Sequence, residues 1–267
     1  MNKGRWIFVV LLVALPLGAL PPIAISEEVE IENVLLVTLD GLRWQELFGG
    51  AESRLIHKEI GKVKDVDAIR KKFWHEDPIE RRKLLMPRFW RLILQQGQLF
   101  GSPDHESSAV VKNKKNFSYP GYNELLSGAV DLTIDSNDKK YNENVTVLEW
   151  LNRMPEFKGK IAAFCSWDVF PFIINDKRSG VYVDAGWQPL EIFETDEARN
   201  AYRLMEQQLP RYWPNVRYDA FTHRGALEYL KVKFPRVSYT WRSAKPMTGL
   251  TTVDTICISN LPRRAIK

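Results

Sequence analysis

Apolar runs and helical patterns alternate along the chain. Residues 33–39 form a continuous run of apolar and β-branched side chains, the pattern of a strand buried on both faces of a parallel sheet. A second apolar run, at residues 161–164, predicts a strand over 160–166, and a short strand is predicted at 98–101. Helical patterns separate these runs. The chain is therefore predicted to have an α/β fold, with a mostly parallel sheet and helices on both faces.

Helical spacing is clearest between residues 79 and 96, where apolar side chains recur every three or four positions. The other predicted helices are residues 120–126, 145–153, 196–209 and 218–234. The polar, charge-rich stretch 49–78 is predicted to be a loop with short helical pieces.

The start of the chain has the features of a secretory signal. Lys3 and Arg5 precede an apolar run at residues 6–20, and residues 24–26 (Ala-Ile-Ser) offer small side chains where a signal peptidase cleaves. The run contains Pro16 and is shorter than the roughly 20 residues that span a bilayer. We therefore predict a removed signal peptide over residues 1–26, with an uncleaved membrane anchor as the alternative. The mature protein would be periplasmic or extracellular and would not contact the membrane.

The distribution of charge argues against a nucleic-acid partner. The formal net charge of the chain is +5. Residues 1–26 contribute two positive charges, and residues 235–267 contribute six positive and one negative, which leaves −2 for residues 27–234. One basic cluster falls on a helical pattern and is predicted to be a solvated face: Arg81, Arg82, Lys83, Arg88 and Arg91.

The spacing of cysteines and histidines indicates neither a disulfide framework nor a metal site. The two cysteines are Cys165 and Cys257, and Cys165 follows an apolar run, so it is predicted to be a small buried side chain. The four histidines show no ligand spacing and are predicted to be structural or exposed: His57, His75, His105 and His223.

Two segments carry candidate chemistry. Asp40 and Gly41 close the strand at 33–39, which would deliver a carboxylate to the sheet edge where open α/β sheets bind ligands. Ser118 lies two residues before Pro120, which can open a helix, and a helix start favours an anion. An acid and a hydroxyl of this kind could share a metal. Taken singly, Asp40 could equally be a turn residue, and Ser118 could be a helix cap.

These residues resemble the alkaline phosphatase superfamily, and most closely its branch of type I phosphodiesterases and nucleotide pyrophosphatases. In that family the first metal-ligand Asp ends the first strand and is followed by Gly, as Asp40 and Gly41 do here. The family's nucleophile segment reads Thr-Phe-Pro-Asn-His-Tyr-Thr-Leu-Val-Thr-Gly, and residues 118–128 read Ser-Tyr-Pro-Gly-Tyr-Asn-Glu-Leu-Leu-Ser-Gly. The resemblance extends over residues 33–234 in pattern, with these two motifs as its specific part.

The resemblance implies a metal-dependent hydrolase that acts on a small-molecule phosphate ester. Ser118 would be the nucleophile and a metal ligand, and Asp40 a metal ligand. The family uses two divalent ions, commonly zinc in exported relatives, which favour the serine alkoxide and the hydrolysis of a phosphoseryl intermediate. Gly121 and Tyr122 stand where the family has Asn-His, so Asn123 is the candidate for binding a phosphate oxygen. No feature of the sequence indicates an oligomeric state.

Other classes of protein fit the sequence less well. The chain has no Gly-x-Ser-x-Gly elbow of an α/β-hydrolase and no Gly-x-Gly-x-x-Gly motif after its first strand. Sulfatases carry Cys/Ser-x-Pro-x-Arg, and Tyr122 stands in place of that Arg, so a sulfatase-like hydrolase is an alternative. A vestigial or binding protein without catalysis is another. The family needs Asp and His ligands beyond residue 234, and no His follows His223.

Residues 235–267 are predicted to be an out-of-frame tail, so that residues 27–234 are the N-terminal part of an alkaline phosphatase-like domain whose sheet is incomplete at the C-terminus. The helix at 218–234 should lead into an apolar strand, but residues 240–249 are polar and patternless. In a frame shifted by one base, Met247-Thr248 (ATG-ACN) necessarily contains GAC, which encodes Asp. Permitted third bases convert residues 236–252 into R-V-L-Y-V-A-L-G-E-T-D-D-W-A-H-H-G, an apolar strand followed by Asp-x-x-x-His. A one-base deletion near Pro235 would account for this pattern.

Overall fold

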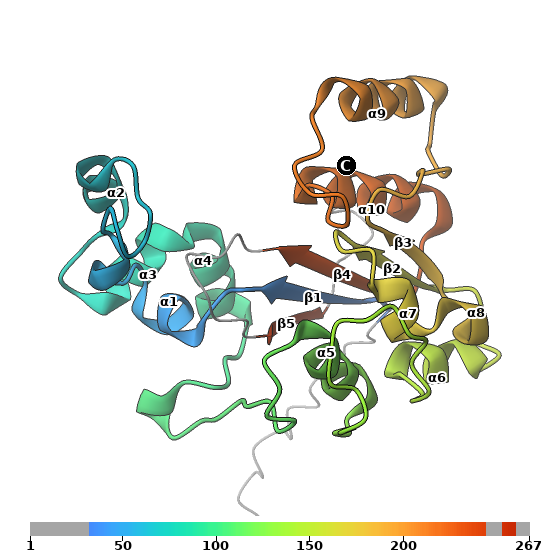
Figure 1. Cartoon of the computed structure of the whole chain (residues 1–267), viewed down its shortest axis with the longest axis horizontal. Coiled ribbons are helices and arrows are strands. Elements are labelled where there is room, and N and C mark those ends of the chain that lie inside the picture. The colour runs from blue at the N-terminus through green and yellow to red at the C-terminus, as the bar shows by residue number, and fades with distance from the viewer. Residues whose placement is uncertain (1–31, 244–252, 260–267) are drawn as a thin grey trace, which may run out of the picture. The chain divides into compact units, whose positions relative to one another are not determined.

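A five-stranded sheet forms the centre of the protein. The computed structural model describes residues 32–243 and 253–259, with side chains up to Trp241. The strands run in the order β3-β2-β4-β1-β5 across the sheet (Figure 1). Their bounds are β1 Val34–Asp40, β2 Ile161–Cys165, β3 Tyr182–Ala185, β4 Val237–Ser243 and β5 Val253–Ser259. Strands β3, β2, β4 and β1 are parallel to one another, and β5 pairs antiparallel with β1.

Helices fill the connections between the strands. Several begin at a side-chain cap: Asp65, Asp77, Thr146 and Thr195 each accept a hydrogen bond from a backbone N–H of the first turn. The α-helices are α1 Trp44–Gly49, α2 Val66–Phe73, α3 Pro78–Leu85, α4 Pro87–Gln96, α5 Ser118–Ser127, α6 Val147–Arg153, α7 Phe170–Ile174, α8 Asp176–Ser179, α9 Asp196–Gln208 and α10 Asp219–Lys233. Two 3₁₀ turns cover Ser53–Leu55 and Pro103–His105.

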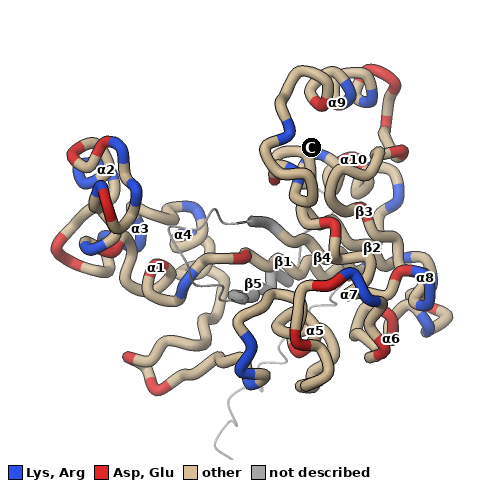
Figure 2. The backbone as a smooth tube through the Cα atoms, in the orientation of Figure 1, with Lys and Arg blue, Asp and Glu red and all other residues tan. Residues whose placement is uncertain are grey.

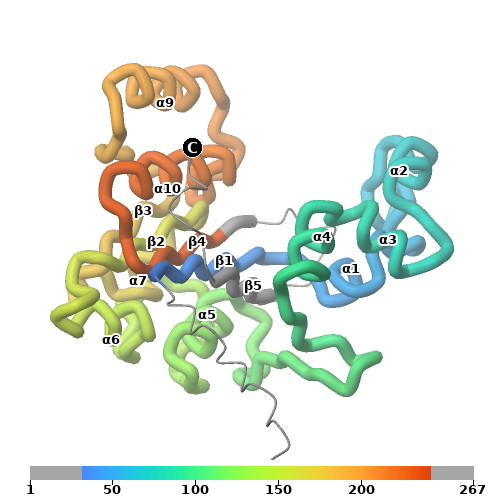
Figure 3. Tube along the Cα trace, turned by 180° about the vertical axis from the view of Figure 1, so that it is seen from behind, coloured from blue at the N-terminus to red at the C-terminus, as the bar shows by residue number. Residues whose placement is uncertain are grey.

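Both faces of the sheet are covered by helices, as the sequence pattern predicts. On β2, Ile161, Ala163 and Cys165 point into the larger core, which includes side chains of α5, α6 and α7. The alternate residues Ala162 and Phe164 pack against Tyr229 of α10 on the other face. Figures 1 and 3 show α9 and α10 on one side of the sheet and α5 to α7 on the other. The predicted α/β class with a mostly parallel sheet is therefore confirmed.

Local differences from the sequence prediction have physical causes. The helix expected over 79–96 is two helices, because Met86 leaves helical geometry (φ −132°, ψ 64°) and Pro87 opens α4. The strand expected at 98–101 is wrong. This segment is an irregular connection, and Gly101 adopts a φ of +90°, outside the range of a strand. The short elements β3, α7 and α8 were not expected, since four or five residues carry little periodicity.

Strand β4 lies in the segment predicted to be an out-of-frame tail. It is a central strand, parallel to both β1 and β2, and Val237 to Trp241 are buried. Residues 235–267 thus supply two strands of the sheet, β4 and β5, although residues 240–243 carry no apolar pattern, and the shifted reading frame stays a prediction. The rest of the tail, at residues 244–252 and 260–267, lies outside the described residues, as does the predicted signal peptide. Among the residues that the structure describes, no helix combines the length and apolarity needed to cross a bilayer.

The basic cluster on α3 and α4 is engaged in local contacts. The Arg81 side chain donates hydrogen bonds to the Gly49 and His75 carbonyl oxygens at 2.8 Å each. The Arg82 guanidinium lies over the Trp90 ring, 3.8 Å from its centroid, and Lys83 pairs with Glu80. Figure 2 shows acidic and basic positions interspersed over α2, α3 and α4. These arginines therefore help hold the helices together.

Candidate functional site

The fold brings Asp40 and Ser118 together. Asp40 is the last residue of β1, at the carboxyl edge of the parallel strands, and Gly41 supplies the turn after it with a φ of +83°. Ser118 is the first residue of α5 and is buried. The Ser118 hydroxyl donates a hydrogen bond to Asp40 Oδ2 at 3.1 Å. Two side chains separated by 78 positions in the sequence thus form one polar pair.

Tyr122 lies near Asp40 and Ser118 and links α5 to β4. One helical turn after Ser118, it lies on the same side of α5 and is fully buried, and its hydroxyl acts to lower the pKa of Asp40. The Tyr122 hydroxyl also accepts a hydrogen bond of 2.5 Å from Trp241 Nε1 of β4. Ser118 therefore makes the direct hydrogen bond to Asp40, and Tyr122 links the same helix to β4. Tyr122 stands where the related family has His, and sequence spacing did not reveal its contact with Asp40.

Burial and hydrogen bonding shift the pKa of Asp40 in opposite directions. Burial raises the pKa of Asp40, and the hydrogen bonds from Ser118 and Tyr122 offset part of that rise by stabilising the carboxylate. Burial also raises the pKa of Tyr122 well above its ordinary value, so the phenol keeps its proton and remains a donor. A carboxylate with a raised pKa beside a serine hydroxyl is a competent acceptor for the serine proton.

The neighbouring residue, Tyr119, links the helix start to the segment after α5. Its backbone N–H donates to Asn137 Oδ1 at 3.0 Å. Its phenol donates to the Lys140 carbonyl oxygen at 2.7 Å and lies 3.3 Å from the Phe172 carbonyl oxygen. Asn137 thus reaches the first turn of α5, a contact that sequence reasoning missed because residues 135–139 read only as a polar insert.

Asn123 has a different role from the one expected. Its side chain is fully buried, and Oδ1 accepts hydrogen bonds from the Asn142 and Asn144 amides at 3.0 and 3.1 Å. Its Nδ2 donates to the Ala129 carbonyl oxygen at 3.3 Å. Because these partners use both ends of the amide inside the protein, the expected contact with a phosphate oxygen is corrected to a structural role.

The described residues supply only part of a two-ion centre. Asp40 and Ser118 offer a carboxylate and a hydroxyl oxygen, donors that suit a divalent ion. Over the parts of the chain that the structure describes, no group of three or more His, Cys, Asp or Glu side chains is arranged to hold a metal. The donor set therefore does not complete the site that the family resemblance implies.

Two of the histidines and Cys165 make contacts within the protein. His57 Nδ1 accepts hydrogen bonds from the Glu59 and Ile60 N–H groups, and His75 Nδ1 accepts from Asp77. Cys165 is a free thiol inside the larger core, as the sequence predicts.

Comparisons with known proteins do not place the chain in a family. It matches no family model, no curated protein and no solved structure. The account of its function therefore rests on the two motifs and on the geometry of the site.

Proposed function

We propose that Asp40 and Ser118 form the nucleophile half of a site that hydrolyses phosphate esters. The observation that carries the proposal is the 3.1 Å hydrogen bond from Ser118 Oγ to Asp40 Oδ2 at the carboxyl edge of the sheet. Two further facts support it. Ser118 lies in the first turn of a ten-residue helix, where the dipole favours a phosphate, and residues 118–128 resemble the phosphodiesterase nucleophile segment.

The chemistry follows from these atoms. Ser118 Oγ attacks phosphorus and gives its proton to Asp40 Oδ2, so that an Oγ–P bond forms while the ester O–P bond breaks. The leaving alkoxide takes a proton from water. The hydroxide formed from that water attacks the phosphoseryl group, the Oγ–P bond breaks, and Ser118 Oγ takes its proton back from Asp40, which releases phosphate and restores both side chains. Tyr122 keeps the Asp40 carboxylate facing Ser118 through both steps.

The family resemblance extends the proposal to divalent ions, with zinc as the favoured metal, to a small-molecule phosphate ester as substrate, and to a periplasmic or extracellular location. The described donors provide one part of that centre, so no step of the reaction is assigned to an ion here. Ligands beyond Asp40 and Ser118 would follow β4, because Asp40 is in register with Ser243 at the end of that neighbouring strand.

A protein without catalysis is the second candidate. The observation that favours it is that no third metal-ligating side chain joins Asp40 and Ser118 among the described residues. In that case the pair would be a remnant of an ancestral site.

Hydrolysis assays separate the two candidates. Metal content, and turnover of p-nitrophenyl phosphate and bis(p-nitrophenyl) phosphate, are measured for the 267-residue chain and for a form with the reading frame restored after Arg236. We expect turnover in the restored form and its loss in Ser118→Ala, with Ser127→Ala at the other end of α5 as the matched control. Retention of a tenth of the activity in Ser118→Ala under single-turnover conditions would remove Ser118 as nucleophile. Absence of turnover in both forms supports the second candidate.

A further inference from the structure

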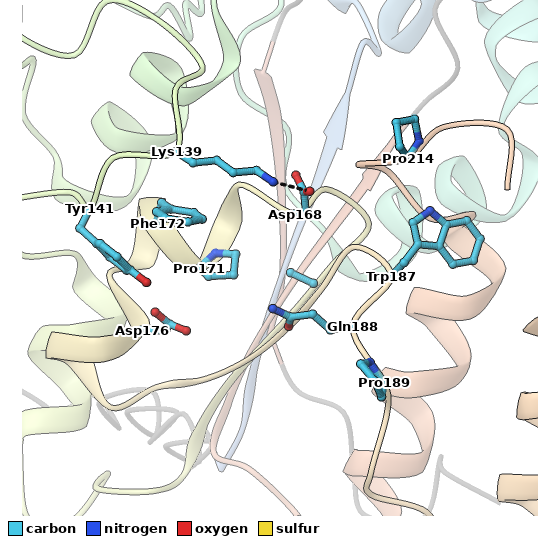
Figure 4. A pocket seen from close by; sticks show the side chains of 11 residues that line it. Lys139, Tyr141, Asp168, Pro171, Phe172, Asp176, Trp187, Gln188, Pro189 and Pro214 are labelled. Atoms are coloured by element: carbon cyan, nitrogen blue, oxygen red, sulfur yellow. Dashed lines mark hydrogen bonds and ion pairs between the residues drawn. The ribbon is translucent and has the colours of Figure 1, made fainter.

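A cavity lies beside the start of α5. It has a volume of about 500 Å³ and opens between the loops that follow β2 and β3 and the segment that follows α5 (Figure 4). Asp168 comes three residues after the end of β2, and Trp187 comes two residues after β3. Because β1, β4, β2 and β3 are parallel, these loops emerge at the same sheet edge as Asp40.

Tyr119 connects this cavity to the proposed nucleophile. It directly follows Ser118, and its phenol contacts the carbonyl oxygens of Lys140 and Phe172, in two segments that line the cavity. The residue next to Ser118 in the chain thus contacts two of the segments that line the cavity.

The cavity walls combine aromatic rings with carboxylates. Tyr141 and Phe172 form one wall, with ring centroids 4.7 Å apart, and Trp187 forms the opposite one (Figure 4). Asp168 Oδ1 and Asp176 Oδ1 are buried oxygens without a hydrogen-bond partner. Asp168 Oδ2 pairs with Lys139 Nζ at 2.6 Å. Unpartnered carboxylate oxygens call for a ligand that donates hydrogen bonds.

The backbone at Gly186 is adapted to this arrangement. A Cβ atom at Gly186 would lie 2.6 Å from Asp168 Cβ, and the residue adopts a φ of +59°. Only glycine fits here, so the end of β3 can approach the Asp168 loop closely.

Charges of both signs near the cavity disfavour an ionic ligand. Lys177 Nζ lies 4.7 Å from the centre of the Tyr141 ring, and the Arg211 guanidinium lies 4.8 Å from that of Trp187. These cations already occupy aromatic faces, which disfavours a cationic ligand. The carboxylates of Asp168 and Asp176 disfavour an anionic one. A neutral ring with several hydroxyl donors and apolar C–H faces satisfies both the oxygens and the aromatic walls.

We propose that this cavity binds a neutral sugar ring, so that the substrate class is a sugar phosphate or a glycosyl phosphodiester. The proposal rests on the proposed function for its link to Ser118, since the sugar would be the alcohol part of the ester. The ring would pack between Phe172 and Trp187 and donate hydroxyl hydrogen bonds to Asp168 and Asp176.

Ligand-observed NMR titration of the 267-residue protein with methyl α-D-glucopyranoside tests the proposal. We expect saturable binding that weakens about tenfold in Asp176→Ala, the effect of losing a hydrogen bond to a charged group. Asp67→Ala, an exposed aspartate in the first turn of α2, is the matched control. Gln188→Ala is a second variant. It changes an exposed residue that lines the cavity, and it should also bind more weakly.

Two outcomes overturn the proposal: binding that is absent or unchanged in both cavity variants, and adenosine binding in the cavity in preference to the glycoside. The glycoside contains no phosphorus, so its binding does not depend on Ser118. Loss of turnover with glycoside binding intact contradicts only the proposed function, whereas turnover without glycoside binding contradicts only the sugar site.

Discussion

At the scale of single residues, the account depends on Asp40, Ser118 and the tyrosine that steadies them. Asp40 and Ser118 could be selected from the sequence because a strand end and a helix start have recognisable local patterns. Tyr122 and Asn137 could not, because their contacts depend on how α5 lies against β1 and on the path of the chain after α5. Asn123 was misassigned for the same reason, since helical spacing does not tell which side of α5 faces the interior.

Asp40→Asn tests the ligand role of the carboxylate. The change keeps the shape of the side chain and removes its charge, so the frame-restored protein should lose bound divalent metal and turnover together. Metal stoichiometry is measured by elemental analysis after dialysis. Asp67→Asn is the control, and an unchanged metal content in Asp40→Asn would reduce Asp40 to a turn residue.

Tyr122→Phe tests the support beneath the pair. Removing the hydroxyl leaves Trp241 Nε1 without its acceptor. We expect the free energy of unfolding to fall by about 1–2 kcal/mol, the cost of an unsatisfied buried donor. Urea unfolding of the 267-residue chain measures this, with Tyr212→Phe, at an exposed position, as control. Equal stability of Tyr122→Phe and the parent would show that this hydrogen bond contributes nothing.

At the scale of elements, most of the long periodic segments followed the sequence, the segment 79–96 being divided at Pro87, and several short elements were not expected. The bounds of β1 and α10 differ from the predicted ones by one residue at each end, and those of α9 by one residue at its end. Their patterns extend over enough positions to fix the type of element. In contrast, β3, α7 and α8 are stabilised by their neighbours. Asn175 at the α7–α8 junction adopts a φ of +51°, and its Nδ2 donates to the Asn142 carbonyl oxygen at 2.8 Å.

The packing of α6 against α8 depends on a buried carboxylate. The Glu149 side chain of α6 is fully buried and accepts hydrogen bonds from Arg178 Nε and Nη2 of α8, both at 2.9 Å. Burial raises the pKa of Glu149, but the hydrogen bonds and charges of Arg178 and Arg153 outweigh it, so the pKa lies below its ordinary value.

This carboxylate should make stability depend on pH in the acid range. Because the pKa is lower in the folded state, the stabilisation is present above the ordinary value of 4.5 and is lost as pH falls through the folded-state pKa. Glu149→Gln should therefore lower the free energy of unfolding by about 2 kcal/mol at neutral pH and flatten its acid dependence. Denaturant titrations between pH 3 and pH 7 measure both effects, with the exposed Glu156→Gln as control. If the free energy of unfolding of Glu149→Gln fell with acid pH as steeply as that of the parent, Glu149 would not be the source of the pH dependence.

At the scale of the whole molecule, β4 is the element on which the account depends most. It lies between β1 and β2, yet the residues facing α10 from this strand are the polar Ser238 and Thr240. Ser238 Oγ is buried without a hydrogen-bond partner. The alternative reading frame places Leu and Val at these two positions, as a central parallel strand requires. The sequence of β4 thus places polar side chains on a buried face of a central strand.

Ser238→Leu tests this conflict directly in the 267-residue chain. Replacing an unsatisfied buried hydroxyl by an apolar side chain should raise the free energy of unfolding by about 1–2 kcal/mol. Urea unfolding of this variant, beside Ser238→Ala, separates the gain from added apolar burial from the gain of losing the hydroxyl. A destabilised Ser238→Leu with a neutral Ser238→Ala would show that the strand has no room for the larger residue.

Sequencing the gene addresses the origin of the tail. We expect the codons of residues 236–252, read one base earlier, to spell an apolar strand followed by Asp-x-x-x-His. Restoring the frame should then yield a longer protein with further Asp and His ligands near Asp40, while the 267-residue form should be inactive and less stable. If the alternative codons do not encode these residues, the tail is genuine. The proposal of a protein without catalysis is then favoured.

The most direct test of the central claim is to trap the phosphoseryl intermediate. The frame-restored protein is mixed with bis(p-nitrophenyl) phosphate, quenched in acid within the first turnover, digested, and analysed by mass spectrometry. The account predicts a phosphoryl-containing adduct on Ser118, absent from Ser118→Ala and present in Ser127→Ala. Turnover without any adduct on Ser118, or with an adduct on another residue, would contradict it.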